Sequence, residues 1–334
     1  MQTVQASLKI SIITPSFNQG QFLEQTIDSV LSQNYPNLEY IIVDGGSTDN
    51  SVEIIQKYEK YLAYWVSEKD RGQSHAINKG LQKATGTVVN WLNSDDYYLP
   101  GAFDCIAEHF QSEKVNVLCA KSEILYKGKV MKISSGTDLF PHNLAKTIGW
   151  ARIDQPETFF RRSCLASLGG LQERLHYVMD KEVWIRYLIS FGLEGIVRVD
   201  TPLAVFRLHE SSKTTTQQKR FDAETNAMYC QLAKEVRQEE VAQQIAKLVV
   251  PSSDSPVNPF QGIDIILGYV ALHYFLFYKM RALYAQNDFK QAKEWASLLD
   301  LGVLKKEDAA EFQKISHRMR YPVAFKKLLN KVRK

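Results

Sequence analysis

Two kinds of hydrophobic pattern alternate along the first two-thirds of the chain. Short apolar, β-branched runs typical of strands occupy residues 8–14, 39–43, 64–66 and 87–92. Apolar side chains at helical spacing occupy the stretches between them, residues 21–33, 51–61 and 73–84. Strand and helix in regular succession predict an α/β domain on a largely parallel sheet, with right-handed crossovers.

The pattern changes after Lys213, where strand-like runs stop and long helical patterns rich in Gln, Lys, Ala and Leu begin. We therefore expect two domains, 1–213 and 214–334, of which the second is all-helical. Within it, Leu272–Gln286 and Phe289–Leu299 predict a helix pair similar to one tetratricopeptide hairpin. The apolar stretch Ile263–Tyr278 is shorter than the roughly 20 residues that span a bilayer. We interpret it as a buried helix, with membrane contact as the alternative.

The amino-acid composition is typical of a folded, globular protein. Its 334 residues are 45% hydrophobic and 23% charged, which excludes intrinsic disorder and low-complexity scaffolds. The net charge of +4 is too small to indicate a nucleic-acid partner. Residues 301–334, however, contain ten Lys and Arg residues and three Asp and Glu residues. The last residues, around Lys326–Lys334, predict an amphipathic helix that either packs on its neighbours or contacts an anionic membrane surface.

Cysteine usage bears on the compartment. Cys105, Cys119, Cys164 and Cys230 are widely separated and show neither a disulfide framework nor zinc spacing. The first nine residues lack the apolar core of a signal peptide. We expect a cytoplasmic protein, working in the cytoplasm or at the inner face of the membrane.

Polar loops follow all four predicted strands. They are Thr14–Asn18, Asp44–Asp49, Glu68–Gln73 and Asn93–Asp96. Since the carboxyl ends of parallel strands meet at one edge of a sheet, these loops should form one ligand site.

The order and spacing of these loops carry a resemblance to a known family. Ser11–Asn18, Ile41–Asp49, Asp70–Gln73 and Leu92–Asp96 together resemble family 2 glycosyltransferases of the GT-A fold, over residues 8–213. The resemblance implies a mixed, mostly parallel sheet with helices on both faces. It also implies an inverting transfer from a nucleotide-sugar donor to a glycan or lipid-linked acceptor in surface polysaccharide synthesis, with Mn²⁺ or Mg²⁺ as cofactor.

The resemblance assigns metal binding to Asp95, and to His209 as a second ligand. A cation held by carboxylates at a strand end would stabilise the leaving diphosphate. The alternative is that Asp95 and Asp96 cap the helix that starts near Pro100. The family usually has Asp-x-Asp here, whereas this chain has Asn93 in the first position, which lowers the charge of the site by one.

Nucleotide binding falls, by the same resemblance, to residues on each of the four loops. Asp44 would accept the ring N–H of the base, which favours uridine diphosphate as the carrier. The others are Thr14, Pro15, Asn18, Asp70, Arg71, Gly72, Asn93 and Ser94. Ordinary turn and loop chemistry is the alternative for Asp44 and for Asp70–Gln73, and we interpret Asp49 as a helix cap.

The segment Tyr177–Arg186 resembles the family segment that opens with the catalytic base, which would be Asp180. The family has Glu before this acid, whereas this chain has Met179. The alternative is that Asp180 is only a helix cap. By resemblance, Gln155 and Glu157 shape the acceptor pocket, and Ser212 and Lys213 hold the diphosphate.

Two other functions remain open from the sequence. A nucleotidyltransferase could share this fold, but the Gly-rich basic loop that such enzymes carry after the first strand is missing. A catalytically inactive nucleotide-sugar-binding module, acting through its helical region, is the alternative from a different class, and Asn93 is the feature that favours it.

Overall fold

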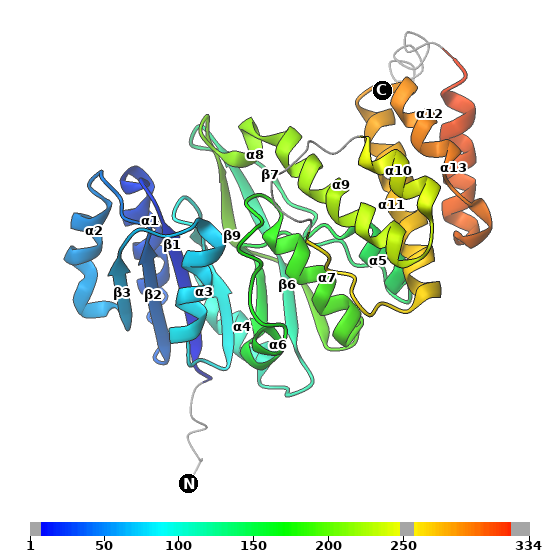
Figure 1. Cartoon of the computed structure of the whole chain (residues 1–334). Helices are drawn as coiled ribbons and strands as arrows, with labels where there is room; N and C mark the ends of the chain where they lie inside the picture. The colour runs from blue at the N-terminus through cyan, green and yellow to red at the C-terminus, as the bar shows by residue number, and fades with distance from the viewer. Residues whose placement is uncertain (1–7, 248–256, 322–334) are drawn as a thin grey trace. The chain divides into compact units, whose positions relative to one another are not determined.

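The structure, a computed structural model, describes residues 8–247 and 257–321 (Figure 1). The described chain forms two compact units. Unit 1 contains the described residues up to Asp138 together with Arg152–Glu224, and unit 2 contains Leu139–Ala151 and the described residues from Thr225 on. Compared with the expected division after residue 213, unit 1 extends to Glu224 and gives up Leu139–Ala151 to the helical unit.

Unit 1 is built on a mixed nine-stranded sheet in the order β3-β2-β1-β4-β8-β6-β9-β5, with β7 paired to β6. The strands are β1 (Ile10–Ser16), β2 (Leu38–Asp44), β3 (Tyr64–Ser67), β4 (Val88–Trp91), β5 (Tyr97–Tyr98), β6 (Val117–Tyr126), β7 (Lys129–Ile133), β8 (Thr158–Arg161) and β9 (Ile196–Leu208). The four predicted strands, β1 to β4, are all parallel, so the predicted α/β class is confirmed. The antiparallel β8 then joins β4 to β6, which pairs in parallel with β9.

Helices flank both faces of this sheet. They are α1 (Gly20–Leu31), α2 (Ser51–Tyr58) followed by the 3₁₀ turn η1 (Glu59–Tyr61), α3 (Gln73–Lys83), α4 (Ala102–Phe110), α6 (Arg162–Ser167), α7 (Met179–Phe191), α8 (Lys213–Thr216) and the start of α9 (Gln218–Glu235). Successive residues of a strand face opposite sides of the sheet. Ile12 accordingly lies in the core with Ile27 of α1, whereas Ile13 meets Gly80 of α3, where a Cβ would lie 2.4 Å from Ile13 Cγ2.

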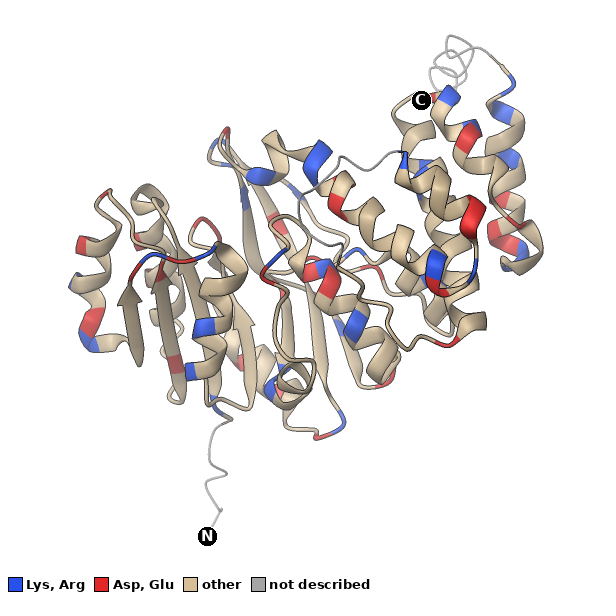
Figure 2. Cartoon of the chain, in the orientation of Figure 1, with Lys and Arg blue, Asp and Glu red and all other residues tan. Residues whose placement is uncertain are grey.

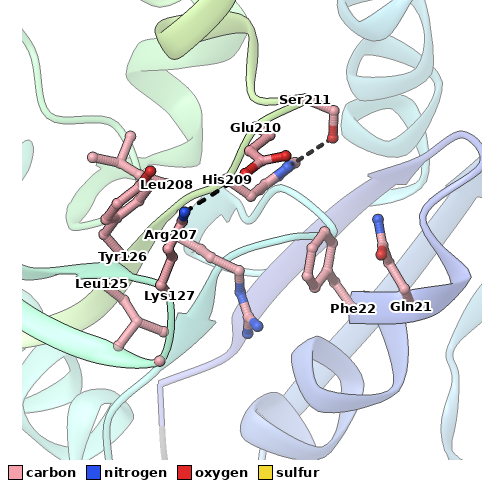
Figure 3. A pocket seen from close by; sticks show the side chains of 11 residues that line it. Gln21, Phe22, Leu125, Tyr126, Lys127, Arg207, Leu208, His209, Glu210 and Ser211 are labelled. Atoms are coloured by element: carbon pink, nitrogen blue, oxygen red, sulfur yellow. Dashed lines mark hydrogen bonds and ion pairs between the residues drawn. The ribbon is translucent and has the colours of Figure 1, made fainter.

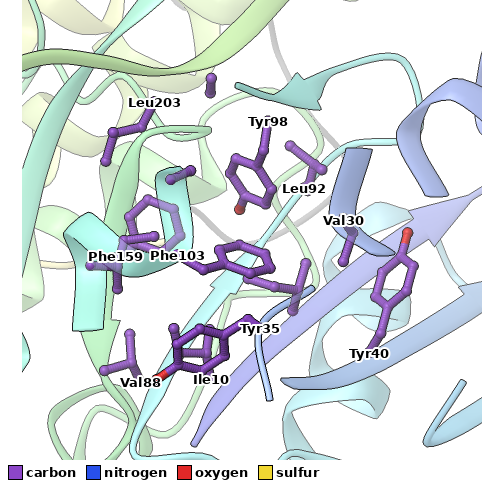
Figure 4. Close-up of a cluster of buried hydrophobic side chains, with 14 of the residues drawn as sticks. Ile10, Val30, Tyr35, Tyr40, Val88, Leu92, Tyr98, Phe103, Phe159 and Leu203 are labelled. Carbon is purple, nitrogen blue, oxygen red and sulfur yellow. The ribbon is translucent and has the colours of Figure 1, made fainter. Parts of the chain in front are cut away.

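An aromatic cluster anchors the part of unit 1 that carries the polar loops (Figure 4). The Phe103 ring of α4 contacts Tyr98 of β5 at 5.3 Å and Tyr35 at 6.1 Å between centroids. Tyr98 also contacts Phe159 of β8 at 5.7 Å. Because Tyr98 lies two residues after the Asn93–Asp96 loop, burial of its ring helps to hold that loop at the sheet edge.

Unit 2 is helical in its described residues. It contains α5 (Leu144–Trp150), most of α9, α10 (Glu239–Ala246), α11 (Ile265–Ala285), α12 (Phe289–Ser297), the 3₁₀ turn η2 (Leu301–Val303) and α13 (Lys306–Arg318). The predicted helix pair is present as α11 and α12, and Asp288 caps α12 by accepting the N–H of Gln291 at 3.0 Å.

Helix α11 is the buried centre of unit 2, as its apolar sequence predicted. Phe275 stacks on Tyr229 of α9 with 3.7 Å between ring centroids. Gly149 of α5 lies so close to α11 that a Cβ would be 2.5 Å from the carbonyl oxygen of Ala271. Among the described residues, none of the helices combines the length and the apolar character that crossing a bilayer requires.

Only part of the basic region after residue 300 lies within the described residues. Helix α13 carries Glu307 and Asp308 in its first turn and Arg318 in its last turn, an order that suits the helix dipole (Figure 2). The amphipathic basic segment predicted around Lys326–Lys334 lies outside the described residues.

Candidate active site

Asp95 and His209 meet at the edge of the sheet in unit 1. Asp95 lies between β4 and β5, and His209 directly follows β9, 114 residues later. Nε2 of His209 lies 3.0 Å from Oδ2 of Asp95, and its Nδ1 lies 2.8 Å from Oγ of Ser211. The His209 ring also packs against Phe22 of α1, with 4.7 Å between centroids. The structure therefore brings together the two side chains predicted to bind the metal.

Arg207 holds this loop in place, and sequence reasoning gave it no role. Its backbone N–H donates to Oδ1 of Asp96 at 2.9 Å, and its Nε donates to the carbonyl oxygen of Asp95 at 2.8 Å. Its guanidinium lies 4.7 Å from the centroid of the Phe22 ring. The available signal was position, because residues two apart on a strand share a face and Arg207 precedes His209 by two.

Helix capping does not explain the two acids. Helix α4 begins after Gly101 and has no side-chain cap. Asp96 is turned inward and is 1% exposed. Burial and the neighbouring charge of Asp95 raise the pKa of Asp96 well above its ordinary value. Asp95 is thus the carboxylate of this loop that remains available at the site.

A chain of hydrogen bonds connects the predicted donor and diphosphate residues. Nε2 of Gln73 donates to Oδ1 of Asn93 at 2.7 Å. Nζ of Lys213 donates to Oε1 of Gln73 at 3.0 Å and to the carbonyl oxygen of His176 at 3.2 Å. Burial lowers the pKa of Lys213, and the charges of Glu224 and Asp95 oppose that shift. Ser212 accepts the N–H of His209 with its Oγ at 2.9 Å and so shapes the turn.

Asp180 lies in the first turn of α7 without capping the helix. The cap residue is Val178, and Oδ1 of Asp180 accepts the adjacent N–H of Lys181, at 2.8 Å. Burial raises the pKa of Asp180 to about 6, with a small contribution from the charge of Asp154. The side chains of Trp184 and Leu188 on the same helix are fully buried.

Glu224 holds the segment that leads into Asp180, and the sequence contained no signal for it. Its carboxylate accepts the backbone N–H groups of His176, Tyr177 and Val178 at 3.0, 2.9 and 3.1 Å. Because Lys213 bonds the carbonyl oxygen of His176, this segment belongs to the same network as Gln73 and Asn93.

The Asp44 carboxylate is used by its own turn. It is fully buried and accepts N–H bonds from Gly46 and Ser47 and hydroxyl bonds from Ser47 and Ser67. Gly46 has a φ of +83°, which favours glycine. The turn interpretation therefore accounts for the bonds from Gly46 and Ser47, and the remaining one comes from Ser67 at the end of β3. The acid interpreted as a cap, Asp49, accepts the N–H groups of Ser51 and Gly20 at the starts of two helices.

Phe17 is a third side chain that sequence reasoning missed. It is 59% exposed at the end of β1, although large apolar side chains are usually buried. A Cβ on Gly45 would lie 3.3 Å from the Phe17 ring and 2.7 Å from Oδ2 of Asp70, so the three loops meet here. The neighbouring Asn18 ties two of these loops together by accepting the N–H of Thr48 at 2.8 Å.

The remaining predicted nucleotide residues are mostly engaged in holding the loops. Oγ1 of Thr14 lies 3.0 Å from the Tyr40 hydroxyl, Pro15 is buried in β1, and the carbonyl oxygen of Ser94 accepts from Thr26. Asp70 accepts the N–H of Gly72, whose φ of +117° favours glycine. Arg71 forms an ion pair with Glu173 at 2.5 Å.

Gln155 and Glu157, predicted for the acceptor side, lie inside unit 1. Gln155 is 6% exposed and donates to Oδ1 of Asn90, and its Oε1 finds no partner among the described residues. Glu157 is fully buried and accepts from the hydroxyls of Ser122 and Ser134. Both side chains thus connect the strands around them, and neither lies where an acceptor would reach it in this structure.

Burial, reinforced by the charge of Asp154, raises the pKa of Glu157 to about 8. The unfolded chain releases this proton near pH 4.5, so the stability that Glu157 contributes is complete below that pH and falls until about pH 8. At about 1.4 kcal/mol per pKa unit, the loss amounts to several kcal/mol. We expect Glu157→Gln to lose much less stability than the wild type between pH 5 and 9, measured by urea unfolding. The exposed control Glu113→Gln should follow the wild type, and parallel curves for all three proteins would refute the prediction.

A cavity of about 650 Å³ adjoins the Asp95–His209 pair (Figure 3). His209 and Arg207 form part of its wall, together with Phe22 and Gln21 of α1. Leu125 to Gly128, at the turn between β6 and β7, form another part. The polar edge of the sheet thus opens beside a hollow large enough for a small organic ligand.

The donor atoms at this edge suit a hard or borderline divalent cation. A carboxylate oxygen and an imidazole nitrogen are ligands that Mn²⁺ accepts, and Mg²⁺ is commonly held by one or two carboxylates plus substrate phosphates. Among the described residues, no group of three or more His, Cys, Asp and Glu side chains could hold a metal on its own. Asp95 and His209 therefore fit a metal that also binds the substrate.

Comparison with known proteins identifies the class. The model of the family "Glycosyl transferase family 2" matches residues 11–166. An uncharacterized glycosyltransferase of Mycobacterium tuberculosis, MT1564, is 31% identical over 216 residues, covering 59% of this chain and 80% of the relative. TuaG of Bacillus subtilis, a putative teichuronic acid biosynthesis glycosyltransferase, is 44% identical over 92 residues, covering 26% of this chain and 36% of TuaG.

The fold has relatives among solved structures. Residues 1–349 of Staphylococcus aureus TarS, crystallised in complex with UDP-GlcNAc, align with a TM-score of 0.54 and 16% identity over 94% of this chain and 92% of that one. This likeness concerns the fold, which is that of GT-A glycosyltransferases. The chain belongs to glycosyltransferase family 2.

Proposed function

We propose that this protein is an inverting, metal-dependent glycosyltransferase that moves a sugar from a uridine diphosphate sugar to a hydroxyl of a glycan or lipid-linked acceptor. The observation that carries the proposal is the contact of Asp95 with His209 at the carboxyl edge of the sheet, 3.0 Å apart, with Lys213 in the adjoining network. The names of two similar proteins support the setting, since TuaG is assigned to teichuronic acid synthesis and TarS was crystallised with UDP-GlcNAc. We place the reaction in surface polysaccharide synthesis, on the cytoplasmic side of the membrane.

The nucleotide would bind across the ends of β1, β2 and β4. The exposed Phe17 ring offers an apolar face against which a base can stack. Asp44 can accept the uracil N–H only if one of its present donors, from Gly46, Ser47 or Ser67, gives way. Ser16, next to this turn, has a buried hydroxyl without a partner among the described residues, and a ligand here would supply one.

The diphosphate would lie between Asp95, His209 and Lys213. Asp95 and His209 are the side chains that would hold Mn²⁺ or Mg²⁺, and the cation would neutralise the charge that develops on the leaving diphosphate. Lys213 adds a positive charge from the protein, which Gln73 and the His176 carbonyl group orient. Arg207 keeps the backbone of Asp95 fixed while this happens.

Asp180 would take the acceptor proton. As the acceptor oxygen attacks the anomeric carbon, its O–H proton passes to the Asp180 carboxylate and the bond to the diphosphate breaks on the opposite face. One displacement inverts the anomeric configuration. A carboxyl with a pKa of about 6 is ionised at neutral pH yet basic enough to accept the proton.

The test is titration of the protein with uridine diphosphate, with and without Mn²⁺ or Mg²⁺, followed by hydrolysis assays on uridine, guanosine and thymidine diphosphate sugars. We expect tighter binding with metal and turnover of at least one uridine diphosphate sugar. Binding that metal does not enhance would refute metal dependence, and turnover of guanosine diphosphate sugars alone would refute the donor. Metal-enhanced binding without turnover of any sugar or acceptor, unchanged in Asp180→Asn, would indicate an inactive binding module instead.

A further inference from the structure

The hairpin of β6 and β7 exposes an unusual combination of side chains. Val130, Met131 and Ile133 of β7 are 52%, 63% and 54% exposed, and all five residues of this strand are exposed. Lys129 precedes them and Lys132 lies between Met131 and Ile133, and Lys127 lies in the turn. Apolar side chains of this size are usually buried, and their concentration on one short strand marks an interaction surface. We call residues 126–133 the basic hairpin.

The charge of the basic hairpin is positive and largely uncompensated. Residues 126–133 contain three lysines and no acid. Lys127 lies 3.7 Å from Glu210, whereas within the described residues no acidic side chain pairs with Lys129 or Lys132. The partner of this surface is therefore expected to be negatively charged as well as able to receive apolar side chains.

Pairing with a second copy of β7 is disfavoured. Within the described residues β7 is an edge strand, since it pairs only with β6. The register shifts between Ile124 and Leu125, which leaves Met131 as an extra residue without a partner in the ladder. A bulge and lysines on an edge strand are features that oppose edge-to-edge association.

From these observations we propose that the basic hairpin docks the protein on an anionic lipid surface, with Lys129 and Lys132 at the headgroups and Val130, Met131 and Ile133 in the interface. Basic residues next to exposed apolar ones are the combination that such surfaces select, because each kind contributes to binding. A soluble acidic glycan would use the lysines and leave the apolar side chains unexplained.

The position of the basic hairpin connects this docking with the proposed active site. Tyr126, Lys127 and Gly128 of the basic hairpin line the same cavity as Arg207 and His209 (Figure 3). Docking through this hairpin brings the cavity beside the proposed metal ligands to the lipid surface. The inference deepens the proposed function, on which this last step rests, because it makes the acceptor a lipid-linked glycan presented at that surface.

The experiment is flotation of the full chain with vesicles of phosphatidylcholine alone or with 30% phosphatidylglycerol added. We expect binding to the anionic vesicles that weakens with salt. Lys129→Gln with Lys132→Gln should weaken it about 25-fold, at about fivefold for each lysine. Val130→Ser with Met131→Ser should weaken it about tenfold or more. Lys60→Gln with Lys83→Gln, two exposed lysines near β3 at the other end of the sheet, should leave it unchanged.

Binding of uridine diphosphate, measured on the same preparations, shows that each variant is folded and separates the two hypotheses. If the protein bound vesicles but not the nucleotide, the proposed function would be refuted and the docking hypothesis would stand. The docking hypothesis would be overturned if the protein did not bind anionic vesicles, or if neither double variant weakened that binding. It would also be overturned if light scattering showed a dimer that Met131→Ser dissociates, because the partner of the hairpin would then be a second copy of this chain. Equal binding to dextran sulfate, sensitive to the lysines and not to Val130 and Met131, would indicate an acidic glycan and also overturn it.

Discussion

Replacing Asp180 with asparagine is expected to lower kcat by about 10²–10⁴-fold, the usual contribution of a positioned general base. Asparagine has the same shape, and its side-chain oxygen can still accept the Lys181 N–H, so the start of α7 should be preserved. The amide cannot take the acceptor proton. Because the proposed donor site, across the ends of β1, β2 and β4, does not include Asp180, affinity for uridine diphosphate should not change.

The pH dependence gives a second readout for the same residue. Burial raises the pKa of Asp180 to about 6, so below that pH the carboxyl is protonated and cannot act as a base. In the wild type kcat/KM should therefore fall about tenfold per pH unit below about pH 6 and level off above it. The residual activity of Asp180→Asn should lack this acidic limb.

The matched control is Asp104→Asn, which removes an exposed acid in the first turn of α4. It should retain wild-type kcat and the wild-type pH profile. If Asp180→Asn keeps more than about a tenth of the activity, a loss far smaller than a general base contributes, another group is the base. Thermal unfolding of both variants would show whether a loss of activity reflects chemistry or folding.

Asp95→Asn is expected to abolish the effect of Mn²⁺ or Mg²⁺ on uridine diphosphate binding and to lower kcat/KM at least about a hundredfold. The amide removes the negative charge that would attract the cation, and Asn93 already supplies an amide at the family's other acidic position. His209→Gln should act in the same direction, since Nε2 of His209 lies 3.0 Å from Oδ2 of Asp95. Calorimetric titration with and without metal measures both effects.

Asp96→Asn is the matched control for the metal site. Asp96 is 1% exposed and burial raises the pKa of its carboxyl well above its ordinary value, and asparagine at this position can still accept the Arg207 N–H. Metal-enhanced binding should survive this change. If Asp96→Asn and Asp95→Asn lose the metal effect equally, the loop as a whole is responsible. If neither variant loses it, the cation binds elsewhere.

The candidate site was predictable from the sequence where polar residues form a short segment after an apolar strand. Asp95 and Lys213 belong to short polar segments next to strong apolar runs, and local pattern together with family resemblance was enough to find them. Arg207, Glu224 and Phe17 escaped because their importance lies in what they contact. The three N–H groups that Glu224 accepts belong to residues about 46–48 positions away in the sequence. No local pattern records such a contact.

Burial separates the predictions that gained geometric support from those that did not. The sequence motif containing Glu157 resembles an acceptor segment, yet its side chain is fully buried between Ser122 and Ser134. Asp44 likewise satisfies its own turn. A motif specifies the residue type and the approximate place, but only packing decides which way a side chain points.

Hydrophobic periodicity alone determined the α/β class, the four parallel strands from β1 to β4 and the helices between them. It also determined the change to an all-helical pattern near residue 213. Each of these features depends on residues close together in the sequence, within one helical turn or one strand. The tertiary structure decided the antiparallel β8 inserted between β4 and β6, the transfer of Leu139–Ala151 to the helical unit, and the contact of Asp95 with His209. Each of these joins segments far apart in the chain. Such contacts form only when many side chains are buried together, and they therefore produce no periodic pattern in the sequence from which they could be predicted.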